Sequence, residues 1–282
     1  MRLGVYIFPT EYAIDPVELG KRLEDMGFDS LWLPEHTHIP TSRKTPWPGG
    51  GELPREYSWT YDPFVTLTAV AGVTERLLLA TGIALVNQRD PIVTAKAVAS
   101  LDHFSSGRVI FGVGAGWNVD EMENHGAEPK LRWKLLRERV EAMKAIWTND
   151  EAEYHGDLVD FDPIWQWPKP VQKPHPPIYL GGSAPAILPR VVNYCDGWSP
   201  IGVRAQSDFA ASMEELARLA QEAGKPRPRL TIFGSEPTGE ALERHRAAGA
   251  ESVLLTLPSE PADVILPLLD DFVKVGEPYL ST

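Results

Sequence analysis

Residues 3–25, LGVYIFPTEYAIDPVELGKRLED, contain the pattern that decides the fold. An almost wholly apolar run over 3–8 is followed by a loop, and then by a stretch whose apolar residues recur with the period of a helix. Asp15 is suited to cap this helix, and Pro16 to occupy its first turn. Short apolar runs that alternate with helices are typical of parallel strands covered on both faces. The stretch therefore predicts one strand–helix unit of an α/β protein.

Working outward, the same unit recurs along the 282 residues until there are eight. Asp62 before Pro63 predicts the cap of the second helix, and the helix signal is strongest over 131–147, where one face is apolar and the other is charged. Eight units without a break in composition favour a closed (β/α)8 barrel, the TIM barrel, over a doubly wound sheet. We expect one domain over residues 1–282. The predicted strands are 3–8, 30–33, 77–83, 109–113, 178–180, 197–200, 230–233 and 252–256.

The overall charge narrows the class of partner. The chain has 39 acidic and 27 basic residues, a formal net charge of -12, so nucleic acid or an anionic membrane would repel it at long range. Its single cysteine, Cys195, cannot form an internal disulfide, which fits a reducing compartment. No apolar run reaches the length of a membrane span or a signal peptide. We expect a cytoplasmic protein that acts on a small molecule, without nucleic acid or membrane partners.

Two long segments, 34–61 and 150–177, interrupt the alternation of strands and helices. Long loops in a barrel usually belong to the face that carries the active site, although packing decoration is an equal alternative. The four tryptophans in these segments provide flat rings that could wall a pocket, but packing is the expected role for most of them. They are Trp47, Trp59, Trp165 and Trp167.

The residues that follow each apolar run are the candidates for the site, because a parallel barrel builds its active site at the carboxyl ends of its strands. Glu35, His36 and His38 follow the second run and offer proton donors and acceptors near neutral pH. A metal-hydrolase site would need further ligands at later strand ends, where His, Asp and Glu are missing, so we expect no metal. Taken alone, His38 fits an ordinary loop histidine.

Glycine clusters follow two other runs. One cluster, Gly181, Gly182 and Ser183, is typical of a helix start that Ser183 caps. Free N–H groups at such a start would suit a phosphate, although an ordinary capped turn is the alternative. After the fourth run, glycines at 112, 114 and 116 imitate a dinucleotide fingerprint, but Trp117 stands where that motif needs Gly or Ala. We therefore expect no Rossmann domain, and the glycines at 112, 114 and 116 could simply let the strand pack.

Together these segments resemble the luciferase-like flavin or deazaflavin oxidoreductases, a barrel family that includes luciferase-type monooxygenases and enzymes that use coenzyme F420. The resemblance covers nearly the whole chain. It is carried by the segments 27–36, 79–83, 102–108, 112–117, 178–183 and 196–198.

The resemblance implies a cofactor ring across the barrel mouth, backed by a non-proline cis peptide between Gly82 and Ile83. It also implies that Gly181, Gly182 and Ser183 hold the phosphate. Ala115, Gly116 and Trp117 would then lie beside the ring or the ribityl chain. It further implies that Glu35 and His36 face the reactive edge, with His36 as first choice for moving a proton.

One departure matters for the activity that the family suggests. The sugar-phosphate dehydrogenase branch has a glutamate where this chain has Trp117, which argues against that particular activity. A possible homodimer is likewise an expectation from the family alone. Because the tail of coenzyme F420 is anionic, we also expect a basic rim near the phosphate site, from Arg43, Lys44 or Lys169.

The sequence leaves three hypotheses in order of preference. The first is an oxidoreductase that moves a hydride between coenzyme F420 and a small organic substrate. The second is an FMN-dependent luciferase-like monooxygenase that uses oxygen and receives reduced flavin from a partner reductase. The third is a barrel that binds such a cofactor without catalysing a reaction.

Overall fold

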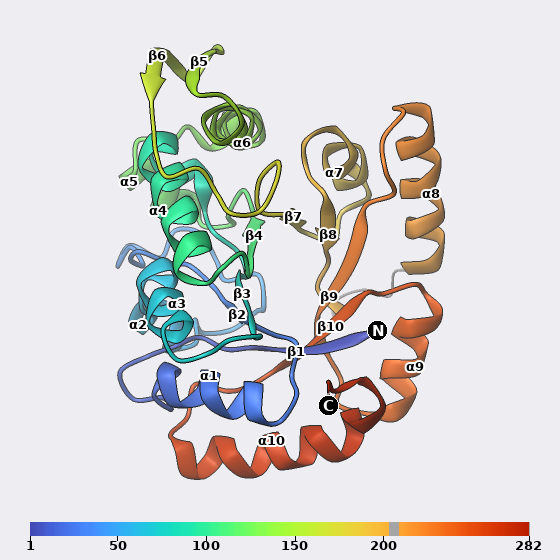
Figure 1. The fold of residues 1–282 in the computed structure, drawn as a ribbon. Coiled ribbons are helices and arrows are strands. Elements are labelled where there is room, and N and C mark those ends of the chain that lie inside the picture. The colour runs from blue at the N-terminus through green and yellow to red at the C-terminus, as the bar shows by residue number, and fades with distance from the viewer. Residues whose placement is uncertain (203–208, 282) are drawn as a thin grey trace.

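The computed structural model describes residues 1–202 and 209–281, and within them eight parallel strands close into a barrel surrounded by helices (Figure 1). The strand order around the barrel is β1-β10-β9-β8-β7-β4-β3-β2, and each neighbouring pair is parallel. The predicted (β/α)8 fold is confirmed. The barrel strands are β1 (Arg2–Tyr6), β2 (Ser30–Leu33), β3 (Leu78–Thr81), β4 (Val109–Val113), β7 (Ile178–Gly181), β8 (Gly197–Ser199), β9 (Arg229–Ser235) and β10 (Ser252–Thr256).

Each barrel strand is followed by at least one helix. Asp15 accepts hydrogen bonds from Val17 N (2.8 Å) and Glu18 N (3.0 Å), and Asp62 caps the helix after it in the same way, so both predicted caps are confirmed. No helix of the described chain is long and apolar enough to cross a membrane. The α-helices are α1 (Pro16–Asp25), α2 (Glu56–Trp59), α3 (Pro63–Ala71), α4 (Pro91–Phe104), α5 (Val119–Asn124), α6 (Arg132–Thr148), α7 (Leu188–Tyr194), α8 (Phe209–Glu222), α9 (Gly239–Ala247) and α10 (Ala262–Gly276), and the 3-10 turns are η1 (Val86–Gln88), η2 (Pro129–Leu131), η3 (Pro185–Ile187) and η5 (Glu277–Tyr279).

The barrel interior is filled by side chains, as expected for a barrel of this size. Trp32 of β2 is completely buried, and its ring lies 5.2 Å from that of Phe233 and 6.0 Å from that of Tyr179. Ala80 and Ile110 complete this layer from β3 and β4. The site at the mouth therefore has a closed, aromatic floor beneath it.

The two long segments lie at opposite ends of the barrel. Residues 34–61 join β2 to α3 at the carboxyl ends of the strands, whereas 149–177 join α6 to the amino end of β7. The second segment, predicted as a loop, contains the antiparallel hairpin β5 (Glu151–His155) and β6 (Asp160–Trp165), which lies outside α6 at the top left of Figure 1. For 150–177 the active-site expectation is therefore wrong, and packing decoration is the alternative that holds.

The hairpin is held to α6 through one buried carboxylate. Glu138 accepts hydrogen bonds from Leu158 N (2.7 Å) and Val159 N (3.0 Å). Trp165 and Trp167 are 78% and 51% exposed on the outer surface, so they do not wall a pocket at the mouth.

Candidate active site

The four neighbouring strands β2, β3, β4 and β7 bring the predicted site residues to one end of the barrel. Their carboxyl ends lead into Glu35 and His36, into Gly82 and Ile83, into 115–117, and into 181–183. Parallel strands in register end at the same edge, so these four segments form the rim of the mouth.

His36 lies against a carboxylate that comes from another element. Its Nδ1 is 2.9 Å from Oε2 and 3.1 Å from Oε1 of Glu121, the third residue of α5. The side chain of Glu121 is completely buried, and that of His36 is 7% exposed. A carboxylate only accepts hydrogen bonds, so Nδ1 carries a proton and Nε2 remains as the nitrogen that can accept one.

Aromatic rings surround this imidazole. The His36 ring is 5.2 Å from that of Tyr57 and 5.9 Å from that of Trp117, and Trp47 contacts Tyr57 in turn at 5.9 Å. The segment 34–61 therefore folds back over the strand ends, and its rings limit the access of water to the histidine.

Glu35 is directed away from this group, although it precedes His36 in the sequence. It is 3% exposed, forms an ion pair with Nε of Arg89 and accepts a hydrogen bond from Leu85 N (2.7 Å). Burial raises the pKa of Glu35, against the effect of Arg89 and the backbone, and Glu35 together with Asp62 raises the pKa of Arg89. These contacts give Glu35 a structural position, and a catalytic role for it stays a prediction.

The peptide bond between Gly82 and Ile83 is cis, as the family resemblance implied. Two glycines leave room for the Ile83 side chain: a Cβ added at Gly114 would lie 2.1 Å from its Cδ1, and one added at Gly181 would lie 2.9 Å from its Cγ2. These two glycines are explained by packing against Ile83.

The prediction that Ser183 caps a helix is wrong. The residue at the cap position is Ala184, ahead of η3, and Ser183 Oγ instead accepts a hydrogen bond from Ile201 N (3.1 Å). The loop is fixed from β8, because Gly182 N donates to Ser199 O (3.3 Å) and Trp198 Nε1 donates to Gly182 O (2.7 Å). The Ser183 side chain is bonded to Ile201, so the backbone of this loop is what remains at the barrel mouth.

Three buried amide side chains near Gly116 have polar atoms without a partner in the described chain. Neither polar atom of the Gln88 or Asn118 carboxamide is hydrogen-bonded, and Asn87 donates to Ala115 O (2.9 Å) while its Oδ1 is free. Gly116 has a positive φ of 70°, and a Cβ there would lie 3.7 Å from Gln88 Nε2. Buried polar groups are normally satisfied. A flat ring edged with carbonyl and N–H groups, such as that of a flavin or deazaflavin, fits these donors and acceptors.

The loop at 181–183 has a similar unsatisfied group beside it. Ser199 Oγ is buried and has no hydrogen-bond partner among the residues described. A hydroxyl next to a glycine loop fits an oxyanion such as a phosphate.

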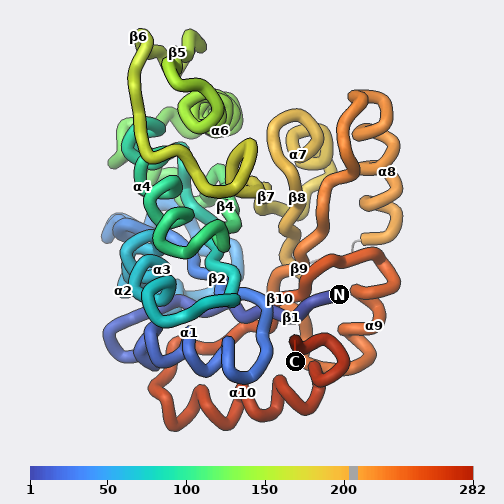
Figure 2. Tube along the Cα trace, in the orientation of Figure 1, coloured from blue at the N-terminus to red at the C-terminus, as the bar shows by residue number. Residues whose placement is uncertain are grey.

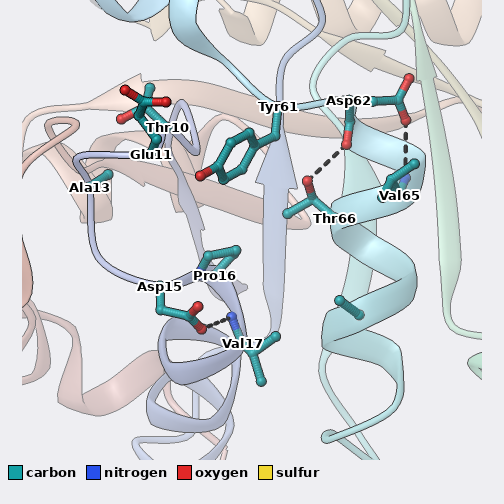
Figure 3. A pocket seen from close by; sticks show the side chains of 11 residues that line it. Thr10, Glu11, Ala13, Asp15, Pro16, Val17, Tyr61, Asp62, Val65 and Thr66 are labelled. Atoms are coloured by element: carbon teal, nitrogen blue, oxygen red, sulfur yellow. Dashed lines mark hydrogen bonds between the residues drawn. The ribbon is translucent and has the colours of Figure 1, made fainter.

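A pocket of about 510 Å³ lies next to the mouth, between the segment after β1 and the start of α3 (Figure 3). Thr10, Glu11 and Tyr61 line it together with the two cap residues Asp15 and Asp62. Asp62 also pairs with Arg89, which links this pocket to Glu35 at the strand ends.

Of the three residues expected to form a basic rim near 181–183, Arg43 lies beside the predicted site residue Trp117. Arg43 has its guanidinium carbon 6.0 Å from the Trp117 ring, and its Nη1 is buried without a partner in the described chain. Lys44 contributes its backbone N–H to Asp120 (3.0 Å). Lys169 is the wrong candidate, because its ammonium donates to backbone oxygens at the end of α6, far along the chain from the strand ends that form the mouth. A contact between Arg43 and a phosphate stays a prediction.

The sequence reasoning missed Glu121, Arg89 and Tyr57. A signal for Glu121 was present, since it lies four residues after Trp117 in the segment that leaves β4. Arg89 and Tyr57 gave no such signal, because the path of the loop that carries Arg89 and the position of the short helix α2 that carries Tyr57 depend on the folded chain. The remaining predicted histidine, His38, lies beside His125 with ring centroids 5.3 Å apart and bonds to Thr37 (3.0 Å), consistent with an ordinary loop histidine.

Comparison with known sequences gives a family match over most of the chain. Residues 3–246 match the model of the luciferase-like monooxygenases. An uncharacterised protein of Mycobacterium tuberculosis is 39% identical over 268 residues, which cover 93% of this chain and 94% of that protein. The FMNH2-dependent dimethylsulfone monooxygenase of Pseudomonas putida is 36% identical, over 50% of this chain and 40% of its own. The F420-dependent glucose-6-phosphate dehydrogenase of Amycolatopsis mediterranei is 31% identical, over 65% of this chain and 52% of its own.

Solved structures agree on the fold. The monooxygenase RslO1 of Streptomyces bottropensis superposes with a TM-score of 0.80 at 19% identity, covering 99% of both chains. An F420-dependent secondary alcohol dehydrogenase, solved with an F420–acetone adduct, superposes with a TM-score of 0.77 at 20% identity, covering 100% of both chains.

Proposed function

This chain belongs to the luciferase-like monooxygenase family, and from that premise we propose that it is an oxidoreductase that transfers a hydride between coenzyme F420 and a small organic substrate. The observation that carries the proposal is the buried pair of His36 and Glu121 at the barrel mouth. The relatives include F420-dependent and FMN-dependent enzymes alike, which supports an oxidoreductase in either case.

The cofactor would be held by backbone and amide groups. Gln88 and Asn118 offer unsatisfied donors and acceptors to the polar edge of a ring, and Ala115, Gly116 and Trp117 would lie along it. Gly181, Gly182 and Ser183, with Ser199 Oγ behind them, would hold the phosphate. Gly82 and Ile83 would support the ring from the barrel side.

When bound, a deazaflavin would accept or supply the hydride, and the chain would move the proton. In the direction of alcohol oxidation, His36 Nε2 would take the hydroxyl proton while the carbonyl forms, and in the reverse direction it would return that proton. Glu121 would hold the ring orientation and stabilise the charge that the imidazole gains. Tyr57 and Trp117 would keep bulk water from the reacting atoms.

FMN remains a second candidate, because the FMNH2-dependent relative is 36% identical over half of this chain. A flavin ring presents the same carbonyl and N–H edge to the amides as a deazaflavin ring does, so the contacts described above suit both cofactors. The two functions differ in chemistry, since only the monooxygenase consumes oxygen.

The test is a pair of binding titrations followed by an oxygen control. The apo protein is titrated separately with coenzyme F420 and with FMN, and quenching of tryptophan fluorescence is followed. Micromolar or tighter binding of F420, much weaker binding of FMN, and turnover with secondary alcohols or ketones that is equal in air and under nitrogen would support the proposal.

The opposite outcomes are equally informative. A preference for FMN together with turnover that stops without oxygen would replace the proposal with the reductase-coupled monooxygenase. F420 binding with no turnover across a panel of small alcohols, ketones and imines would favour a barrel that only binds the cofactor.

A further inference from the structure

A second pocket, of about 480 Å³, lies at the opposite end of the barrel from the candidate active site. Its walls are the segments that precede three neighbouring strands: 172–177 before β7, 192–196 before β8 and 225–229 before β9. Barrel enzymes place their chemistry at the other face, so neither the fold nor the proposed reaction gives this pocket a role.

The lining of this pocket is strongly basic, although the chain as a whole is acidic. Five basic side chains and a single carboxylate, Asp196, line it, in a protein with a formal net charge of -12. Asp196 Oδ2 already accepts a hydrogen bond from Ile178 N (2.8 Å). The basic residues are Lys144, Lys173, Lys225, Arg227 and Arg229.

Three of these cations have no counter-ion. In the described chain, Lys144, Lys173 and Arg227 form no side-chain hydrogen bond or ion pair. The other two are engaged: Lys225 donates to backbone oxygens at the end of α7, and Arg229 lies 3.6 Å from Glu251. Like charges gathered in this way repel one another, and an anion that joins the cluster relieves that repulsion.

A neutral donor completes the lining. Tyr194, the last residue of α7, is 4% exposed, lines the pocket, and its hydroxyl has no hydrogen-bond partner in the described chain. Burial raises the pKa of Tyr194, so the hydroxyl keeps its proton and can donate a hydrogen bond to an oxyanion. A buried donor without a partner in the wall of the same pocket is a second sign of a missing acceptor.

We propose that this pocket binds a small molecule that carries two or more phosphate groups. Phosphate oxygens accept several charge-assisted hydrogen bonds at once, which matches two free lysines, one free arginine and one phenol. Prolines at 174, 177, 226 and 228 stiffen the backbone of the segments that carry these side chains. The volume accommodates inorganic pyrophosphate with room for an attached organic group.

Calorimetric titration of the purified protein with inorganic pyrophosphate, and in a second arm with ADP, tests this site. Each charge-assisted contact is worth tenfold or more in affinity, so Arg227→Gln and Lys173→Gln should each weaken pyrophosphate binding by about tenfold or more. Tyr194→Phe should weaken it several-fold. The matched control is Lys21→Gln, which removes an exposed charge of α1 outside the pocket and should leave binding unchanged.

The arms separate the possible results. Tighter binding of ADP than of pyrophosphate would assign a nucleotide, and equal binding would assign the phosphates alone. The proposal would be overturned if neither probe bound at millimolar concentration, or if Lys21→Gln lost as much pyrophosphate affinity as the pocket variants. It would also be overturned if the protein bound a DNA oligonucleotide but not pyrophosphate. His36→Asn should bind pyrophosphate normally, so this site and the proposed hydride transfer can fail separately.

Discussion

The carboxylate of Glu121 is completely buried and both of its oxygens lie within hydrogen-bond distance of one imidazole nitrogen. Burial of a carboxylate is costly unless it is paired and hydrogen-bonded. The arrangement therefore fixes which nitrogen of His36 bears the proton, and Glu121 is a positioning residue in the proposed reaction.

Replacing either member of this pair should lower turnover without removing the cofactor. His36→Asn should reduce kcat by about 100-fold or more, the usual size of acid–base contributions. Glu121→Gln should lower kcat less and change its pH profile, because the amide no longer stabilises a charged imidazole. The measurements are kcat against pH and cofactor affinity by fluorescence.

The matched control for this pair is Glu123→Gln, an exposed carboxylate on the same helix α5. It should leave kcat and its pH profile unchanged. Full activity of His36→Asn with normal affinity would remove His36 from the mechanism.

A methyl group at Gly114 should damage the support for the ring. The added Cβ would lie 2.1 Å from Ile83 Cδ1, so Ile83 has to move, and overpacking of this kind costs about 1–3 kcal/mol. Gly114→Ala should therefore lower the free energy of unfolding in urea and weaken cofactor binding. Gly239→Ala is the control, because no atom lies within 4 Å of its added Cβ, and it should do neither.

Among single residues, those that the sequence predicted are the ones whose position follows from the strand ends. His36, Ile83 and Trp117 follow their strands by two to four residues, so the topology carries them to the mouth. Glu121 was missed although it lies four residues after Trp117. Arg89 was not predicted, because its contacts depend on how the segment after β3 turns, and no periodic pattern encodes this turn.

Arg89 connects three elements around the mouth. Its guanidinium pairs with Glu35, which follows β2, and with Asp62, which caps α3. Arg89 itself lies directly after η1, in the segment that leaves β3. Glu35 in turn fixes Leu85 N. The contact therefore joins the mouth to the pocket of Figure 3, which Asp62 lines.

Arg89→Gln should destabilise the protein by about 3 kcal/mol, because it leaves the buried Glu35 without its counter-ion. Adding Glu35→Gln should recover part of this loss, since no unpaired charge then remains. Urea unfolding of the wild type, both single variants and the double variant gives the coupling between the two sites. Additive effects would contradict the role assigned to the pair.

The strands and helices of the barrel were predictable because the two patterns that indicate them, apolar runs and helix caps, are local. Asp15 and Asp62 precede prolines that begin helices, and the apolar runs are short and bounded by polar loops. The hairpin β5–β6 was not predictable by the same means. β5 alternates exposed polar residues with buried Ala152 and half-buried Tyr154, but only over five residues, and Pro163 interrupts the pattern in β6. The hydrogen bonds that Glu138 accepts from the turn of the hairpin come from a helix earlier in the sequence, so no local pattern indicates them.

Two histidines, the buried His245 and the half-buried His175, make the stability of the whole molecule depend on pH. Burial lowers the pKa of both His175 and His245 below the ordinary value of about 6.5. The unfolded chain then binds protons that the folded chain does not, so their contribution is present above pH 6.5 and is lost as the pH falls. His155 acts in the opposite sense, since a hydrogen bond to Asp160 raises its pKa.

The free energy of unfolding should therefore fall between about pH 7.5 and pH 5.5. His245→Phe keeps a ring beside Phe209 and removes the titrating group, so it should reduce this fall. His155→Gln on the exposed hairpin serves as the control and should not reduce it. A fall that is identical in the wild type and His245→Phe would count against the assignment.

The barrel closes between strands that lie at the two ends of the chain. β1 pairs with β10 along its whole length, and Arg2 bonds Glu251 across 249 positions of sequence, so blue and red meet in Figure 2. A ribosome adding about 5–20 residues per second needs roughly 12 to 50 seconds to cover that distance. Throughout that time the open edge of β1 and the apolar face of a half-built barrel are exposed to other nascent chains. The half-built barrel therefore has to be shielded from other chains until its last strand emerges.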